Sequence, residues 1–124
     1  MKIKSIHHVS LLVTNIERST AFYKEILQME ELPRPDFDFE GAWLAVGQQQ
    51  LHLIVHEGQT WREGGIDTRD GHVAFEVADY EETLRWLEQK GIPFKANPSS
   101  RAGFPQIFIL DPDHNVIELN MQEK

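Results

Sequence analysis

At 124 residues the chain is long enough to bury the core of one domain without cross-links, and we expect a single domain over residues 1–124. Its 20 acidic residues outnumber its 12 basic ones, and the net charge of −8 argues against nucleic acid and anionic membranes as partners. Without cysteine, any metal ion must be bound by histidine and carboxylate side chains. No apolar run is as long as a membrane span and no signal-peptide core is evident, which predicts a cytoplasmic protein.

The first half of the chain, about residues 1–56, is predicted to contain one strand, one helix and three more strands. Val9 and Leu11 alternate with polar residues, which is typical of a strand with one buried face. Thr14-Asn15 then offers an N-cap for the helix. The order is βαβββ, with a strand at 6–13, a helix at 17–28, and strands at 30–34, 41–46 and 50–56.

The second half, about residues 72–124, repeats this order. A polar, glycine-bearing segment, residues 57–71, precedes it, and we interpret this segment as a linker. Asp79 and Glu82 form the Asp-x-x-Glu pattern of a helix start, and Gly91 marks the helix end. The expected elements are a strand at 72–77, a helix to about residue 90, and strands at 94–96, 106–110 and 116–120. The repetition predicts an α+β fold of two tandem βαβββ modules.

Four of these strands each carry one side chain that can bind a metal ion, on the face opposite their apolar residues. Successive strand residues point to opposite faces, so the side of each candidate is well specified. The candidates form two pairs at matching positions, 64 residues apart (8 to 72) and 66 residues apart (52 to 118). Two ligands from each half of a duplicated domain are suited to one metal ion. The predicted ligands are His8, His52, His72 and Glu118.

Three imidazoles and one carboxylate suit one divalent transition metal ion (Zn, Ni, Co, Fe or Mn) and fit Ca poorly. If all four side chains bind, an octahedral ion keeps two positions for neighbouring oxygens of a substrate. If His52 does not bind, the other three form the two-histidine, one-carboxylate set of non-haem Fe(II) oxygenases. In the first case the metal acts as a Lewis acid, and Glu118 is the candidate catalytic base.

Five further residues are candidates for a substrate pocket. Phe37, Phe39 and Trp43 form its walls in one interpretation, and packing between modules or across a dimer explains them equally well. His56 shares the ligand face with His52 and is a candidate for supporting hydrogen bonds. Arg101 lies in a predicted loop, where it is either a group that binds a substrate carboxylate or phosphate or an ordinary surface arginine.

Four segments of the chain resemble the vicinal oxygen chelate superfamily, which groups glyoxalases, bleomycin-resistance proteins, fosfomycin-resistance enzymes and extradiol dioxygenases. They are IHHVSL (6–11), STAFYKEIL (19–27), GHVAF (71–75) and DPDHNVIEL (111–119), and the resemblance covers essentially the whole chain. It implies that the two modules form a cup, a curved mixed sheet with helices on its outer face, around a metal ion. It also implies a homodimer, and the family's ligand positions fall on His8, His52, His72 and Glu118.

The resemblance is closest to glyoxalase I-like proteins and implies a metal-dependent lyase or isomerase that chelates vicinal oxygens of a small substrate. His52 stands where glyoxalase I enzymes commonly carry a carboxylate or amide, so the resemblance does not imply glutathione-dependent glyoxalase activity. Two alternatives stay open. One is an extradiol-type Fe(II) dioxygenase that uses His8, His72 and Glu118, and the other is a bleomycin-resistance-like protein that binds a drug or metabolite without turnover.

Overall fold

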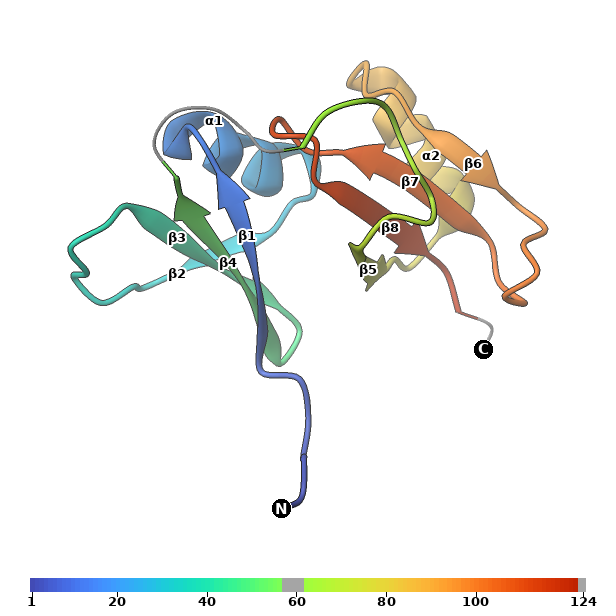
Figure 1. The fold of residues 1–124 in the computed structure, drawn as a ribbon. Helices are drawn as coiled ribbons and strands as arrows, with labels where there is room; N and C mark the ends of the chain where they lie inside the picture. The colour runs from blue at the N-terminus through green and yellow to red at the C-terminus, as the bar shows by residue number, and fades with distance from the viewer. Residues whose placement is uncertain (57–61, 123–124) are drawn as a thin grey trace. The chain divides into compact units, whose positions relative to one another are not determined.

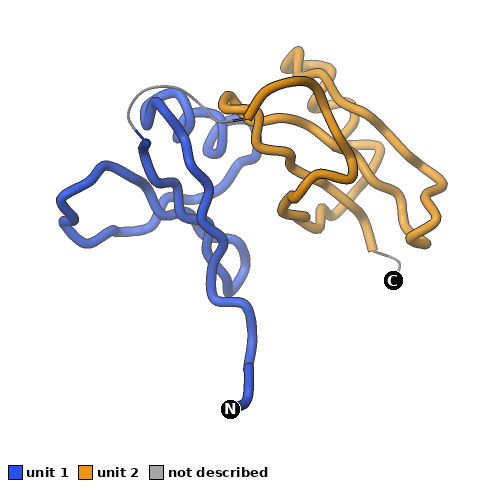
Figure 2. Tube along the Cα trace, in the orientation of Figure 1, with its two compact units in different colours: residues 1–61 blue, residues 62–124 orange. Residues whose placement is uncertain are grey.

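A computed structural model describes residues 1–56 and 62–122 of the chain. The chain divides into two compact units, residues 1–61 and residues 62–124 (Figure 2), and each unit is described by itself. In the described ranges, no helix combines the length and the apolar character that crossing a membrane requires.

The first unit contains one mixed sheet and one helical segment (Figure 1). The strand order in the sheet is β1-β4-β3-β2, with β1 parallel to β4 and the other neighbours antiparallel. Its elements are β1 (His8–Val13), α1 (Ile16–Ala21), η1 (Phe22–Ile26), β2 (Glu30–Leu32), β3 (Gly41–Val46) and β4 (Gln49–Val55). The unit is therefore a βαβββ module, as predicted.

The second unit repeats this plan. Its strand order is β5-β8-β7-β6, again with the first strand parallel to the last and the other neighbours antiparallel. Its elements are β5 (His72–Glu76), α2 (Tyr80–Gln89), β6 (Lys95–Asn97), β7 (Gln106–Leu110) and β8 (Val116–Asn120). The α+β class and the two tandem βαβββ modules are confirmed, and every strand lies within two residues of its predicted range.

Both helices begin at the predicted caps. The side chain of Asn15 accepts a hydrogen bond from the backbone of Arg18, and the side chain of Asp79 accepts one from Glu82. The first helix differs from its prediction, because its second half is a wider π-helix in which the Leu27 N–H donates to the carbonyl of Phe22. It ends before residue 28, because Gln28 adopts a left-handed conformation (φ 58°) that a right-handed helix cannot contain.

Each sheet buries the face that carries its apolar residues. In the first unit, Leu51 and Leu53 of β4 are fully buried, and Tyr23 from the helical segment is buried with them. In the second unit, Ile117 of β8 and Leu87 of α2 are buried in the same way. The hydrophobic effect therefore fixes which face of each strand is left for polar side chains, including the four candidate ligands.

The described part of the predicted linker 57–71 belongs to the second unit, while residues 57–61 lie outside the described residues. Arg62 donates from Nε to the carbonyl of His114 (3.2 Å), and His114 Nδ1 lies 2.9 Å from the carbonyl of Gly64. Lys95 donates from Nζ to the carbonyl of Ile66 (3.1 Å). Residues 62–71 are thus attached to the module that follows them.

Candidate metal centre

Each unit brings its two predicted ligands onto neighbouring parallel strands. In the first unit, His52 on β4 is in register with Ser10 on β1, so His8 is two residues along the same face. In the second unit, Glu118 on β8 is in register with Ala74 on β5, and His72 is again two residues along. The two modules therefore present their pairs in the same register. Over the described residues, no group of three or more histidine, aspartate or glutamate side chains is placed to hold a metal ion.

The first pair lies in an aromatic stack. The rings of His8 and His52 are stacked with centroids 4.0 Å apart, and Trp43 on β3 lies on His52 at 4.3 Å with the ring planes 5° apart. Trp43 is a predicted wall of a substrate pocket, and in the structure its ring also lies against a predicted ligand. Cross-strand register places it there, because Trp43 is directly opposite His52 in the β3–β4 pairing.

Both histidines of the first pair have polar contacts. His52 Nε2 lies 2.8 Å from Gln50 Oε1, and His8 Nδ1 lies 2.9 Å from Nδ1 of His7, so one of those two nitrogens donates. The pKa of His52 is lowered, first because burial disfavours the imidazolium and then because His8, His7 and Arg34 place positive charge nearby. A lowered pKa favours the neutral imidazole, which is the form that binds a metal ion.

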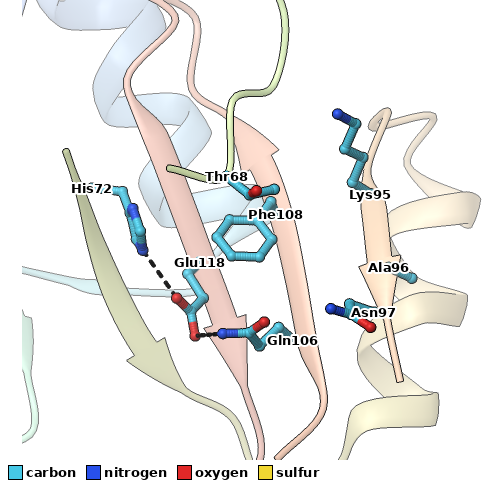
Figure 3. A pocket seen from close by; sticks show the side chains of 8 residues that line it. All are labelled: Thr68, His72, Lys95, Ala96, Asn97, Gln106, Phe108 and Glu118. Atoms are coloured by element: carbon cyan, nitrogen blue, oxygen red, sulfur yellow. Dashed lines mark hydrogen bonds and ion pairs between the residues drawn. The ribbon is translucent and has the colours of Figure 1, made fainter. Parts of the chain in front are cut away.

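The second pair is in direct contact. His72 Nε2 lies 3.0 Å from Glu118 Oε1, and a dashed line marks this contact in Figure 3. The other oxygen of Glu118 accepts hydrogen bonds from Gln106 Nε2 (3.2 Å) and Asn120 Nδ2 (2.9 Å). Glu118 is 5% exposed, so these contacts satisfy a buried carboxylate. Sequence reasoning missed both amides, although Asn120 shares the ligand face two residues after Glu118.

The proton position on His72 makes this pair suited to a cation. His72 Nδ1 lies 2.7 Å from the backbone carbonyl of Asp70, which can only accept, so Nδ1 carries the ring proton of the neutral imidazole. The lone pair of Nε2 then faces Glu118 Oε1, and two acceptors at this distance need a proton or a metal ion between them. An imidazole nitrogen and a carboxylate oxygen are ligands that divalent transition metals prefer, so this donor pair fits such an ion.

A pocket of about 520 Å³ opens beside the second pair. Figure 3 shows the side chains that line it, with Glu118 between His72 on one neighbouring strand and Gln106 on the other. Most of the lining is polar, and Lys95 contributes a positive charge. The eight lining residues are Thr68, His72, Lys95, Ala96, Asn97, Gln106, Phe108 and Glu118.

Four of the five predicted pocket residues lie in the first unit, where the rings of Phe37 and Trp43 have centroids 6.2 Å apart. Phe37 and Phe39 are stacked at 5.2 Å in the first unit and line a different pocket, of about 440 Å³, together with Arg34. The guanidinium of Arg34 lies 4.7 Å and 5.0 Å from the centroids of these two rings. His56 follows β4 in the same unit. Arg101 is exposed in the second unit and is not among the residues that line the pocket beside Glu118.

Comparison with known proteins agrees with this architecture. Residues 5–119 match the Glyoxalase/Bleomycin resistance protein/Dioxygenase superfamily. The chain is 28% identical to glyoxylase I 4 of Arabidopsis thaliana, over 96% of this chain and 71% of that protein. It is 26% identical to the metallothiol transferase FosB of Staphylococcus epidermidis, over 97% of this chain and 83% of that protein. Among solved structures, a Bacillus anthracis protein assigned to the glyoxalase family has a TM-score of 0.82 at 26% identity, covering 99% of this chain and 98% of that one.

Proposed function

Because the chain belongs to the Glyoxalase/Bleomycin resistance protein/Dioxygenase superfamily, we propose that it is a metal-dependent lyase or isomerase of the glyoxalase type. Its substrate is a small molecule with oxygens on neighbouring carbons, such as an α-hydroxy or α-keto compound. One divalent transition metal ion is held by His8 and His52 from the first module and by His72 and Glu118 from the second. The names of the two relatives, a glyoxylase and a metallothiol transferase, support this class of chemistry.

The contact between His72 and Glu118 is the observation that carries the proposal. His72 Nε2 and Glu118 Oε1 are 3.0 Å apart, the carboxylate is buried, and His72 Nδ1 lies 2.7 Å from the carbonyl of Asp70. A histidine that donates its second N–H to a backbone carbonyl has the orientation and tautomer of a metal ligand. A purely structural ion pair would not need the polar pocket that opens beside it.

The side chains around the pocket have distinct roles in the proposed reaction. When bound, a divalent ion supplies Lewis acidity that polarises a carbonyl group of the substrate. Glu118 is the proposed base: when its carboxylate is released from the ion, it takes a proton from the substrate carbon next to that carbonyl and returns it to the neighbouring carbon. Lys95 uses one N–H for the carbonyl of Ile66, and its remaining donors are available to bind a negatively charged substrate oxygen.

Elemental analysis of protein purified without a histidine tag tests the proposal. We expect about one equivalent of a transition metal per chain in the wild type and its loss in the His72→Ala/Glu118→Ala variant. Exchange of the substrate's α-proton in deuterated water, followed by NMR with α-hydroxy and α-keto compounds, then tests proton transfer. If the wild type holds no metal even after reloading, the enzymatic proposal fails. The half-exposed ring pair Phe37 and Phe39 then favours a protein that binds an aromatic compound without turnover.

A specific contact favours one second candidate, the Fe(II) dioxygenase. Because His52 Nε2 is engaged by Gln50, the three side chains His8, His72 and Glu118 form a possible ligand set without His52. Anaerobic loading with Fe(II), followed by measurement of oxygen uptake on catechols, tests this candidate. If the protein retains its iron but takes up no oxygen, the dioxygenase candidate is ruled out.

A further inference from the structure

The two oxygens of Glu118 have different kinds of partner. Oε1 faces only the ring nitrogen of His72 among the described contacts, at 3.0 Å. Oε2 accepts two hydrogen bonds, from the side-chain amides of Gln106 (3.2 Å) and Asn120 (2.9 Å). Both amides are neutral, so they hold the carboxylate without neutralising its charge.

The orientation of the Asn120 amide is set by a further hydrogen bond. Asn120 Oδ1 accepts from Gln122 Nε2 at 2.8 Å, which leaves the Nδ2 end of the Asn120 amide to donate to Glu118. Gln106 is directly opposite Asn120 in the β7–β8 register, so the two amides approach the same oxygen from neighbouring strands. The three amide side chains form a connected network with Glu118 at one end.

The first module supplies a comparison within the same chain. His52 occupies the register position that corresponds to Glu118, and the positions that correspond to Gln106 and Asn120 are Gly41 and Ile54, which pair with each other in the β3–β4 register. Neither can donate a side-chain hydrogen bond. The amide pair therefore accompanies the carboxylate and is missing where the equivalent ligand is an imidazole.

We propose that Gln106 and Asn120 are positioning residues, which clamp Oε2 of Glu118 and so reserve Oε1 for the metal ion. This inference rests on the proposed metal site. A carboxylate without the clamp rotates about its last side-chain torsion, and either oxygen can then face His72. With Oε2 held by two donors, the same oxygen always faces His72, and the binding geometry is organised before the ion arrives.

Metal affinity of single variants tests the clamp. Gln106→Leu and Asn120→Leu remove the donors at similar side-chain volume, and Gln89→Leu is the matched control, because Gln89 is an exposed amide at the end of α2 that does not line the pocket. Zn²⁺ dissociation constants are measured by competition with a chelator, and the visible spectrum of the Co²⁺-loaded protein reports the ligand geometry. We expect each clamp variant to bind Zn²⁺ about 10–100-fold more weakly and to alter the Co²⁺ spectrum, with the control unchanged.

The outcomes separate the clamp from the metal site itself. If the wild type binds the ion and folded clamp variants bind it equally tightly with the same Co²⁺ spectrum, the clamp proposal is wrong. The proposed metal site is then retained. If the wild type binds neither ion, both proposals fail. Thermal unfolding of the metal-free proteins identifies variants that do not fold. Asn120→Ala, which leaves space for water, replaces Asn120→Leu in that case and is held to the same expected loss of affinity.

Discussion

Trp43 lies flat against His52, with ring centroids 4.3 Å apart and ring planes 5° apart. With His8 on the opposite face of the imidazole, the ring of His52 is held between two other rings. An indole in this position is an optical reporter of what binds to His52. Stacking also restricts the side-chain rotation of His52, so His52 would lose less conformational entropy on binding a metal ion.

We therefore expect Co²⁺ to quench the fluorescence of Trp43. The ion absorbs in the visible range and is paramagnetic, so an indole stacked on one of its ligands loses emission. Trp43→Phe should remove most of the response, while Trp86→Phe should retain it, because Trp86 lies in α2 with Lys90 over its ring. Titration of the metal-free proteins with Co²⁺ makes the measurement. An undiminished response in Trp43→Phe would place the ion away from this stack.

The two modules should contribute unequally to metal affinity. His72 Nε2 faces a carboxylate and has its other nitrogen satisfied, whereas His52 Nε2 is already engaged by Gln50 at 2.8 Å. Binding through His52 Nε2 costs the loss of that hydrogen bond, about 0.5–1.5 kcal/mol. We expect His72→Ala to weaken Zn²⁺ binding more than His52→Ala does, as measured by chelator competition. Equal losses, or a larger loss at His52, would contradict this order.

The four candidate ligands could be chosen from sequence because strand alternation decides which side chains leave the core. His52 and Glu118 follow this rule directly, with Leu51 and Leu53 buried beside the first and Ile117 and Leu119 beside the second. The duplication strengthened the choice, because both modules use one register. The contacts that each ligand makes were not accessible in this way, since they depend on which residues of neighbouring strands are directly opposite.

Trp43 and Gln106 illustrate the contacts of the candidate ligands that could not be predicted from the sequence. Trp43 meets His52 because the β3–β4 hairpin turns at Gly47, whose positive φ (58°) fixes the pairing of the two strands. Gln106 meets Glu118 because of the β7–β8 register, which the irregular segment 111–115 sets. Gln50 and Asn120 were within reach of sequence reasoning, because each shares a strand face with a predicted ligand two residues away. The cup and the dimer that the resemblance implies stay predictions.

Tyr80 should make the stability of the protein sensitive to alkaline pH. It is 5% exposed and donates its hydroxyl proton to the carbonyl of Gln106 at 3.3 Å. Its pKa is raised from the usual value of 10, first by burial and then by the nearby charge of Glu81. Above about pH 10 the unfolded chain ionises this tyrosine while the folded protein keeps it protonated. The unfolded state then binds fewer protons, so this contribution to stability is lost as the pH rises.

Tyr80→Phe isolates this effect. At neutral pH we expect the variant to be less stable by about 0.5–1.5 kcal/mol, the usual contribution of one hydrogen bond. Above about pH 10 the wild type should lose stability faster than the variant, so the difference between them should shrink. Urea unfolding at a series of pH values from neutral to alkaline makes the comparison. Parallel pH curves would show that Tyr80 does not titrate in this way.

Gly41 should not tolerate a side chain. A Cβ atom there would clash with the carbonyl oxygen of Leu53 and would lie 3.0 Å from a guanidinium nitrogen of Arg34. The carbonyl cannot move away easily, because β4 is paired with β1 on one side and with β3 on the other. The lack of a side chain at Gly41 also leaves room for Arg34, which donates to the carbonyl of Phe39 (3.0 Å) and lies against the two phenylalanine rings.

We therefore expect Gly41→Ala to destabilise the protein by about 1–3 kcal/mol, the range for overpacking a close contact. Gly65→Ala is the matched control: no heavy atom lies within 4 Å of a Cβ built at Gly65, so its effect should stay within about 0.5 kcal/mol. Urea unfolding measures both. Gly41→Ala should also weaken the binding of any aromatic compound to Phe37 and Phe39, because Arg34 packs on both rings and lines the same pocket. A Gly41→Ala protein as stable as the control would mean that β3 and β4 can separate locally, and the register that brings Trp43 to His52 would then be less firmly set than the strand pairing indicates.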